Sequence, residues 1–239
     1  MEITCDLHMH SALSPCAVND MTPNNMVNMA MLSELTAIAV TDHNSCENAA
    51  ALIDVANRTD TGFVVIPGME VHTVEDIHVV TLFPDITVAK AMQEYVYAAL
   101  PDITATSKQQ AKQLIMDADD EVIGHCDKLL NMATNLPLEK VISLAHDCGG
   151  TAFPAHIDRK SYSILSSLGF IPENLPISCV EVSMFSEPDS YRQQYPQYRI
   201  LTDSDAHELG HIGMVFNNLD VMTVSPHGII KVLDETPEI

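Results

Sequence analysis

Short apolar runs that alternate with helical segments limit most strongly how this chain can fold. Seven runs have strand character, at residues 3–7, 37–41, 63–67, 77–83, 151–155, 179–183 and 198–202. Most are separated by stretches with helical periodicity, which is typical of α/β proteins with a largely parallel sheet. Residues 71–76 are too few for a crossover helix, so the third and fourth runs are predicted to form a hairpin. The pattern favours a barrel-like α/β fold, although the count alone also fits an open sheet.

The strand rhythm stops between residues 84 and 137. Residues 88–100, 107–118 and 127–133 within this stretch are predicted to be helical. A chain of 239 residues is long enough to bury one large core. We therefore expect a single domain over residues 1–239, with a helical insertion at residues 84–137 that could cap a site.

The charge balance restricts the partners that this chain can bind. Its 11 basic and 33 acidic residues give a net charge of −22, which argues against a large nucleic-acid surface and against an anionic membrane surface. Small anionic substrates remain compatible with this charge, because divalent cations can make one pocket locally positive. The sequence has neither a signal-peptide pattern nor an apolar run approaching ~20 residues, so we expect a cytoplasmic protein. The oligomeric state is not predicted.

Histidines and carboxylates follow the predicted strands. His8 and His10 come directly after the first run, where their i, i+2 spacing directs both imidazoles to one face and allows them to bind one cation. Asp6 shares that face and could accept a hydrogen bond from one of the rings. Further candidates follow or lie in later runs: Asp42, His43, Glu70, His78, His156, Asp205 and His207. Because strand ends meet at one rim of an α/β barrel, we expect these side chains to gather there.

This set of donors is too large for one tetrahedral zinc ion. It suits two or three divalent transition metal ions (zinc, manganese or iron), with a carboxylate such as Glu70 bridging two of them. Ions arranged in this way provide a bridging hydroxide as the nucleophile and neutralise the oxygens of a phosphoryl group. Phosphate ester hydrolysis is therefore the first functional hypothesis, and carboxamide hydrolysis is its chemical neighbour.

Six short motifs that contain these residues occur in a fixed order. They are Asp6-Leu7-His8-Met9-His10-Ser11, Thr41-Asp42-His43, Gly68-Met69-Glu70, Ile77-His78-Val79, Pro154-Ala155-His156 and Ser204-Asp205-Ala206-His207. In this set and order the chain resembles the PHP (polymerase and histidinol phosphatase) domain family over residues 6 to 207. The resemblance implies a distorted seven-stranded β/α barrel, a trinuclear metal centre and metal-dependent phosphoesterase activity.

The resemblance also implies a ligand assignment. The first metal is expected to be held by His8, His10, Glu70 and Asp205, the second by Glu70, His78 and His156, and the third by His43 and His207. Asp6 and Asp42 are then expected to support the ligands. We count Asp42, together with Arg159, among the catalytic candidates.

The chain departs from the family pattern at one ligand. Family members commonly place Asp or His five or six residues after the H-x-H motif, where this chain has Pro15 and Cys16. A Cys16 thiolate could bind a soft ion such as zinc. The alternatives are that Asp20 fills the third site, or that the site is weak or empty.

Arg159 is the expected anchor for the anion. It lies three residues after His156, and its planar guanidinium could hold a phosphate through two parallel hydrogen bonds. Lys160 is the alternative to Arg159.

Three functions fit this constellation. The first is hydrolysis of a small phosphorylated metabolite or nucleotide. The second is an exonuclease that trims oligonucleotide ends, which the net charge of −22 disfavours. The third is a catalytically silent, metal-binding regulatory module. Four other histidines are interpreted as structural or solvated: His72, His125, His146 and His227. Two further residues remain open, since His211 could contact substrate and Glu181 could face the pocket.

Overall fold

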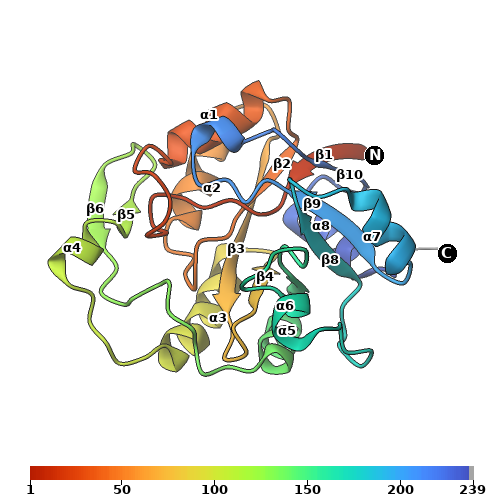
Figure 1. Ribbon diagram of the computed structural model, residues 1–239. Coiled ribbons are helices and arrows are strands. Elements are labelled where there is room, and N and C mark those ends of the chain that lie inside the picture. Colours follow the sequence, from red (N-terminus) through yellow and green to blue (C-terminus); the bar gives the residue numbers. More distant parts are fainter. Residues whose placement is uncertain (237–239) are drawn as a thin grey trace.

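A curled sheet of six strands forms the centre of the computed structural model, which describes residues 1–236 (Figure 1). The strand order is β10 (Asn217–Asp220), β1 (Glu2–Asp6), β2 (Ala37–Val40), β3 (Val64–His72), β4 (His78–Leu82) and β7 (Thr151–Pro154). β1, β2 and β3 are parallel, and β4 is antiparallel to both β3 and β7. The predicted hairpin between β3 and β4 is therefore confirmed.

A separate parallel pair, β8 (Cys179–Ser183) and β9 (Arg199–Asp203), lies between the two edges of this sheet. Ile157, just after β7, donates its backbone N–H to the Glu181 carbonyl at 2.8 Å. On the other side, Thr202 N donates to the Asn217 side chain at 2.9 Å, but β9 and β10 form no ladder in the described chain. The α/β prediction is confirmed. The curled sheet is consistent with the expected distorted barrel, but the count of seven strands is not confirmed.

β10 is a strand that was not predicted from the sequence. All seven predicted strands are present, but β10 adds an eighth around the ring and pairs antiparallel with β1 from Glu2↔Asp220 to Cys5↔Asn217. Its sequence, Asn-Asn-Leu-Asp, has little β-propensity and a single apolar residue. Backbone pairing with β1 and burial of Leu219 hold it in place, and neither is visible in the local sequence.

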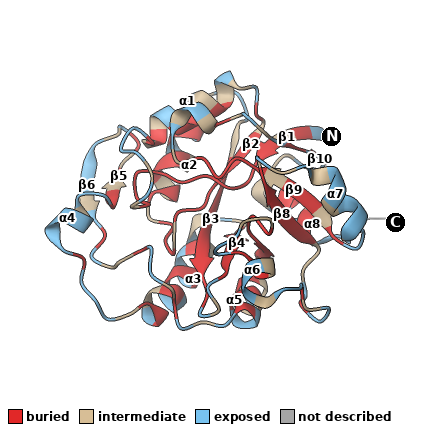
Figure 2. Cartoon of the chain, in the orientation of Figure 1, coloured by how far each residue is buried: buried red, intermediate tan, exposed pale blue. Residues whose placement is uncertain are grey.

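Successive side chains of the strands enter two different cores, as the two-residue period of a strand requires. In β2, Ala37 and Ala39 join a core that includes α8 (Pro226–Asp234), whereas Ile38 and Val40 join the core on the other face. Helices cover this second face, as the buried and exposed sides in Figure 2 show. They are α1 (Pro23–Leu32), α2 (Ala49–Arg58), α3 (Ile86–Ala99) and α5 (Leu138–Asp147).

The helix ends follow local sequence signals. Thr22 caps α1 by accepting a hydrogen bond from Asn25 N, and Ser225 caps α8 in the same way from Gly228 N. Gly169 ends α6 (Ile164–Leu168) in the left-handed conformation. A further short helix, α7 (Pro188–Gln194), precedes β9. In the described part of the chain, every helix is too short or too polar to cross a membrane.

The predicted helical insertion is only partly helical. α3 is present, but α4 (Ser107–Gln110) is a single turn, and residues 114–118 do not continue it. Instead β5 (Leu114–Met116) pairs with β6 (Val122–His125), because Leu114 and Met116 bury against Ala12.

The predicted helix at residues 127–133 is also absent from this described stretch, and side chains take over its backbone groups. Gln113 donates to the carbonyls of Cys126 and Lys128, and Asn44 donates to those of Leu130 and Met132. The prediction of helices here was wrong because tertiary contacts outweigh weak helix propensity.

Candidate metal centre

His8 and His10 lie just after β1, with their Nε2 atoms 3.2 Å apart. His8 Nδ1 is 2.7 Å from Glu181 Oε2, and because a carboxylate only accepts, the proton of this pair is on Nδ1. His8 therefore directs Nε2 at His10. The expectation that Asp6 would orient a ligand ring was wrong, since Asp6 accepts from the backbone N–H groups of Ser204 and His8.

A second hydrogen-bond chain fixes His10. Asp42 Oδ1 accepts from the Ser14 hydroxyl at 2.6 Å, so the Ser14 oxygen is left to accept from His10 Nδ1 at 2.9 Å. Asp42 also accepts from the Ser11 amide and hydroxyl and is buried. Asp42 thus reaches the centre through Ser14, and His10 directs its Nε2 at His8.

The space that both Nε2 atoms face fits a cation. Asp205 Oδ1 lies 3.4 Å from His8 Nε2 and 3.0 Å from His10 Nε2, and it has no hydrogen-bond partner among the described residues. Ligand atoms about 2.0–2.1 Å from one tetrahedral ion lie about 3.3 Å from each other. The three observed separations, from 3.0 to 3.4 Å, match that spacing.

Glu70 lies at the middle of the cluster. Its Oε1 is 2.8 Å from His78 Nδ1 across the β3–β4 hairpin and 3.2 Å from His156 Nε2 beyond β7. Its Oε2 is 2.8 Å from His43 Nδ1, yet has no hydrogen bond of good geometry among the described residues. This buried carboxylate thus contacts imidazoles from three separate segments, and the bridging role expected from the sequence stays a prediction.

The outer edge of the cluster is formed by His207, His43 and Cys16. His207 Nδ1 donates to the Asp205 carbonyl at 2.7 Å, so its Nε2 faces Cys16 Sγ, 3.1 Å away. His10, His43 and His207 offer nitrogens within 4.8 Å of one another. Cys16 therefore lies beside His207 at the outer edge, and its role as a third-metal ligand stays a prediction.

Two ligand candidates have left-handed backbone conformations. His156 has φ 30° and Asp205 has φ 48°, and both follow directly on strand ends. Non-glycine residues adopt this region at a cost, and such strain is concentrated at functional sites. Here it turns both side chains toward Glu70 and the histidines.

The cluster sets the pKa values of its own members. Burial alone would raise the pKa of Glu70, but its interactions with His78, His8 and His43 hold that pKa well below its usual value. Burial lowers the pKa of His78 to about 4, so its ring is neutral at neutral pH. The pKa of His8 is raised because Glu181, Asp205 and Glu70 outweigh the effect of burial. A divalent cation would compete with that proton, as metal binding to histidine generally does.

Arg159 lies beside the centre, against Asp205. Its Nη1 is 2.8 Å from Asp205 Oδ2, and its side chain remains 38% exposed. The guanidinium has five N–H donors, so donors remain for an incoming anion. The structure therefore places Arg159 beside the cluster, as expected from its position after His156.

Two further aromatic rings, not among the expected site residues, border the cluster. Tyr162 stacks on His78 with ring centroids 4.8 Å apart, and His72 meets His78 edge-on at 4.7 Å. Both line a pocket of about 200 Å³ that also contains Cys16 and His43. His72, interpreted above as structural or solvated, thus borders the site. Its signal was the two-residue spacing from Glu70, which puts both on one face of β3.

Glu181 and Asp203 also face the centre. Glu181 shares one face of β8 with Cys179, which belongs to the core beneath the site, so the alternation of β8 could have assigned it. Asp203 accepts from Leu7 N at 2.6 Å and from Asn217 at 2.8 Å, and thereby ties β9 to the chain that carries His8. His211 pairs with Glu208 instead of joining the cluster.

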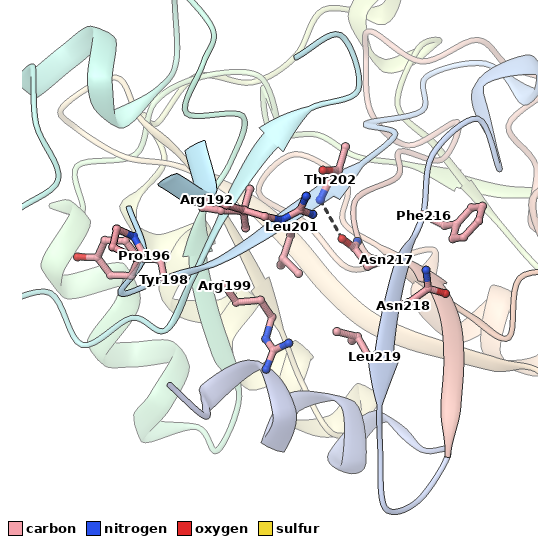
Figure 3. Close-up of a pocket in the computed structure, with 11 residues that line it drawn as sticks. Arg192, Pro196, Tyr198, Arg199, Leu201, Thr202, Phe216, Asn217, Asn218 and Leu219 are labelled. Carbon is pink, nitrogen blue, oxygen red and sulfur yellow. Dashed lines mark hydrogen bonds between the residues drawn. The ribbon is translucent and has the colours of Figure 1, made fainter. Parts of the chain in front are cut away.

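A larger pocket lies elsewhere. It has a volume of about 490 Å³ and opens between β9 and β10, with Arg192, Arg199 and Phe216 in its walls (Figure 3). Arg192 is paired with Asp189 at 2.6 Å, and none of the clustered ligand candidates lines this pocket. The donors lie beside the smaller pocket near Glu70, which is therefore the candidate functional pocket.

The PHP domain model matches residues 6–218. The chain belongs to the PHP-domain family. This confirms the resemblance noted from the six motifs, and the match includes every ligand candidate of the PHP-type centre.

Curated relatives of this PHP-domain chain include two exoribonucleases. The chain is 26% identical over 179 residues to "5'-3' exoribonuclease Rnm" of Salmonella typhimurium, which covers 70% of this chain and 56% of that protein. It is 33% identical over 85 residues to the Rnm protein of Escherichia coli, covering 34% of this chain and 28% of that one. The chain thus spans about half the length of the Salmonella relative and a smaller share of the Escherichia coli relative.

Solved structures with the same fold extend this comparison. The lesion-specific endonuclease EndoQ of Pyrococcus furiosus superposes with a TM-score of 0.75 at 18% identity, over 98% of this chain and 56% of that one. A putative metal-dependent phosphoesterase from Bifidobacterium adolescentis gives 0.58 at 17% identity, over 86% and 88%. At these identities the likeness concerns the fold alone.

Proposed function

We propose that this PHP-family chain is a metal-dependent phosphoesterase that hydrolyses a small phosphorylated metabolite or nucleotide. The observation that carries the proposal is the convergence of imidazole and carboxylate donors at tetrahedral spacing around the buried Glu70. A structural ion needs only one closed set of ligands, whereas this cluster has several overlapping sets and an open mouth.

Three overlapping groups of donors support two or three divalent transition ions such as zinc, manganese or iron. They are His8, His10 and Asp205; His43, Glu70 and His78; and His10, His43 and His207. His156 contacts Glu70 and adds a further nitrogen to the second group. When bound, such ions supply a hydroxide nucleophile near neutral pH and neutralise the oxygens of a phosphoryl group.

The chain itself binds and orients the phosphate. Arg159 lies beside Asp205 with donors to spare, so it can hold an anion through two parallel hydrogen bonds at the mouth. Asp42 acts as a positioning residue, since it fixes the Ser14 hydroxyl that in turn fixes His10. The insertion at residues 84–137 borders the mouth through Asn131, which supports its role as a cap.

An exonuclease acting on oligonucleotide ends is the second candidate. The comparisons favour it, although the net charge of the chain disfavours it. One relative is named as an exoribonuclease, and two solved structures with the same fold are a lesion-specific endonuclease and an Endonuclease Q complex with a 27-mer duplex substrate. The expectation that nucleic acid is disfavoured rested on the charge of −22, which limits a large surface but does not prevent an end from entering the pocket.

Hydrolysis by the metal-loaded protein tests both candidates. The substrates are 4-nitrophenyl phosphate, a nucleoside 5'-monophosphate and a short 5'-phosphorylated RNA, each in zinc, manganese or iron(II). Glu70→Gln should abolish turnover, and His125→Gln, at an exposed histidine on β6, is the matched control that should not.

The substrate pattern decides between the candidates. Faster hydrolysis of the monoesters supports the first candidate, and release of mononucleotides from the RNA supports the second. Tight metal binding without turnover of any substrate would contradict both and leave the silent regulatory module.

A further inference from the structure

We propose that Cys16, His43 and His207 form a thiolate-containing cation position at the outer edge of the centre, which selects a thiophilic ion such as zinc over manganese or magnesium. This inference deepens the proposed function by assigning different metal preferences to different parts of one cluster. It concerns binding, so it can be tested without any substrate.

The geometry at Cys16 is that of a prepared ligand set. His207 directs Nε2 at the Cys16 sulfur, 3.1 Å away, because its Nδ1 is committed to the Asp205 carbonyl. His43 lines the same pocket as Cys16 and offers a nitrogen within 4.8 Å of one on His207. Two imidazoles and one thiol thus converge, which is the donor type of many zinc sites.

The loop that carries Cys16 is held in place on both sides. Ala17 N donates to the Ser14 carbonyl at 3.0 Å, and Val18 N donates to the His207 carbonyl at 3.0 Å. The second bond ties the loop directly to the ligand that Cys16 faces. The sulfur therefore reaches its position by backbone pairing and not by the chance orientation of a surface side chain.

A second, independent observation points to a cation nearby. Glu70 Oε2 is almost fully buried and has no hydrogen-bond partner of good geometry among the described residues, although it lies 2.8 Å from His43 Nδ1. A buried carboxylate oxygen in this state is costly unless a positive charge satisfies it. His43 thus links the sulfur-containing position to the bridging carboxylate.

Ligand softness gives the selectivity. The groups around His8 and His78 consist of nitrogen and oxygen donors, which accept manganese as well as zinc. Only the outer position, within the described cluster, adds a sulfur, and thiolate favours zinc strongly over manganese and magnesium. Cys16 is exposed at the pocket of about 200 Å³, which provides an entry path for the ion.

Cobalt(II) is the probe, because a thiolate bound to cobalt gives a near-ultraviolet charge-transfer band that nitrogen and oxygen ligands do not. Metal-free full-length protein is titrated with cobalt(II) and the bound ions per chain are counted. We expect the band to appear in the wild type and to be lost in both Cys16→Ser and Cys16→Asp. Cys148→Ser, at a half-buried cysteine after α5 and outside the cluster, is the matched control and should keep the band.

Zinc and manganese titrations test the selectivity. Cys16→Ser should weaken one zinc position by about tenfold or more, the effect typical of losing even a supporting contact of a ligand. Manganese affinity should change less. Cys16→Asp should reduce the difference between the zinc and manganese affinities, because a carboxylate is a hard donor.

Three results would overturn the inference: no charge-transfer band in the wild type at full cobalt loading, a band that persists in Cys16→Ser, or equal losses of zinc and manganese affinity. None of them depends on turnover. A phosphatase without the band would refute this inference alone, and a band without turnover would refute the proposed function alone.

Discussion

Single residues outside the ligand set decide which ring nitrogens of the centre can accept a cation. Glu181 fixes His8, and the Asp42–Ser14 pair fixes His10, so that both Nε2 atoms face the same point. Such contacts keep each imidazole in one orientation and tautomer. The sequence pointed to the ligands through their spacing, but Ser14 carried no signal of its own.

Replacing Ser14 by alanine should weaken metal binding without removing a ligand. His10 Nδ1 would lose its acceptor and Asp42 one of its donors, while both remain buried. We expect a loss of about 10–100-fold in the affinity of the position held by His10. Calorimetric titration with zinc measures it, and Ser143→Ala on the exposed side of α5 is the control. Equal affinities in the two variants would contradict the role of Ser14.

Cys16 should be a reactive thiol when the metals are removed. Burial raises the pKa of Cys16, but the hydrogen bonds and positive charge of His207 and His43 together have the larger effect. They lower this pKa to about 7. Since the thiolate is the nucleophile, the rate of alkylation by iodoacetamide in chelator-treated protein should rise with pH through a midpoint near this pKa. Peptide mapping measures the modification at each pH. A midpoint above pH 8, or no protection by added zinc, would contradict this assignment.

At the scale of elements, the β3–β4 hairpin is the part of the fold that makes Glu70 a bridging candidate. Register pairing of His72 with His78 brings the two strands together beside the site, so that His78 reaches Glu70. Sequence reasoning could foresee this hairpin, because the connection is too short for a crossover. It could not foresee β5 and β6, since these strands depend on burial against Ala12.

A close approach within this hairpin predicts a sensitive glycine. A Cβ at Gly68 would lie 2.5 Å from the Thr81 carbonyl oxygen and 2.9 Å from Leu82. Gly68→Ala should therefore lower the free energy of unfolding by about 1–3 kcal/mol through overpacking. Gly210→Ala is the control, because its Cβ would meet open space at an ordinary φ. Urea denaturation of the metal-free variants compares them, and equal stabilities would show that the hairpin adjusts.

The whole molecule combines a strongly acidic surface with a buried cluster of cation ligands. The net charge of −22 is spread over a chain whose few basic groups include Arg159, which lies beside Asp205 of the site. Bound cations would provide the positive charge there that the surface lacks. The molecule can therefore attract a small anion to one place without a basic surface.

Metal loading should stabilise the entire fold, because the ligands come from strands at both ends of the sequence. An ion at 100 times its dissociation constant adds about 2.7 kcal/mol to the free energy of unfolding, or roughly 5–10 °C in Tm for a domain of this size. Differential scanning calorimetry with zinc and with chelator measures the shift. In Glu70→Gln, zinc should raise the Tm clearly less than in the wild type. An equal rise in Tm would show that the stabilising ion binds elsewhere.

By itself, the sequence determined the α/β class, the seven expected strands, the hairpin and the identity of the ligand candidates. It could do so because strand periodicity, short connections and donor chemistry are local properties. Only the tertiary structure decided that β10 joins β1, that the β8–β9 pair forms no ladder with either edge of the six-stranded sheet, and that Glu181 and Ser14 orient His8 and His10. These features depend on contacts between residues far apart in the chain, where backbone pairing and burial outweigh local propensity.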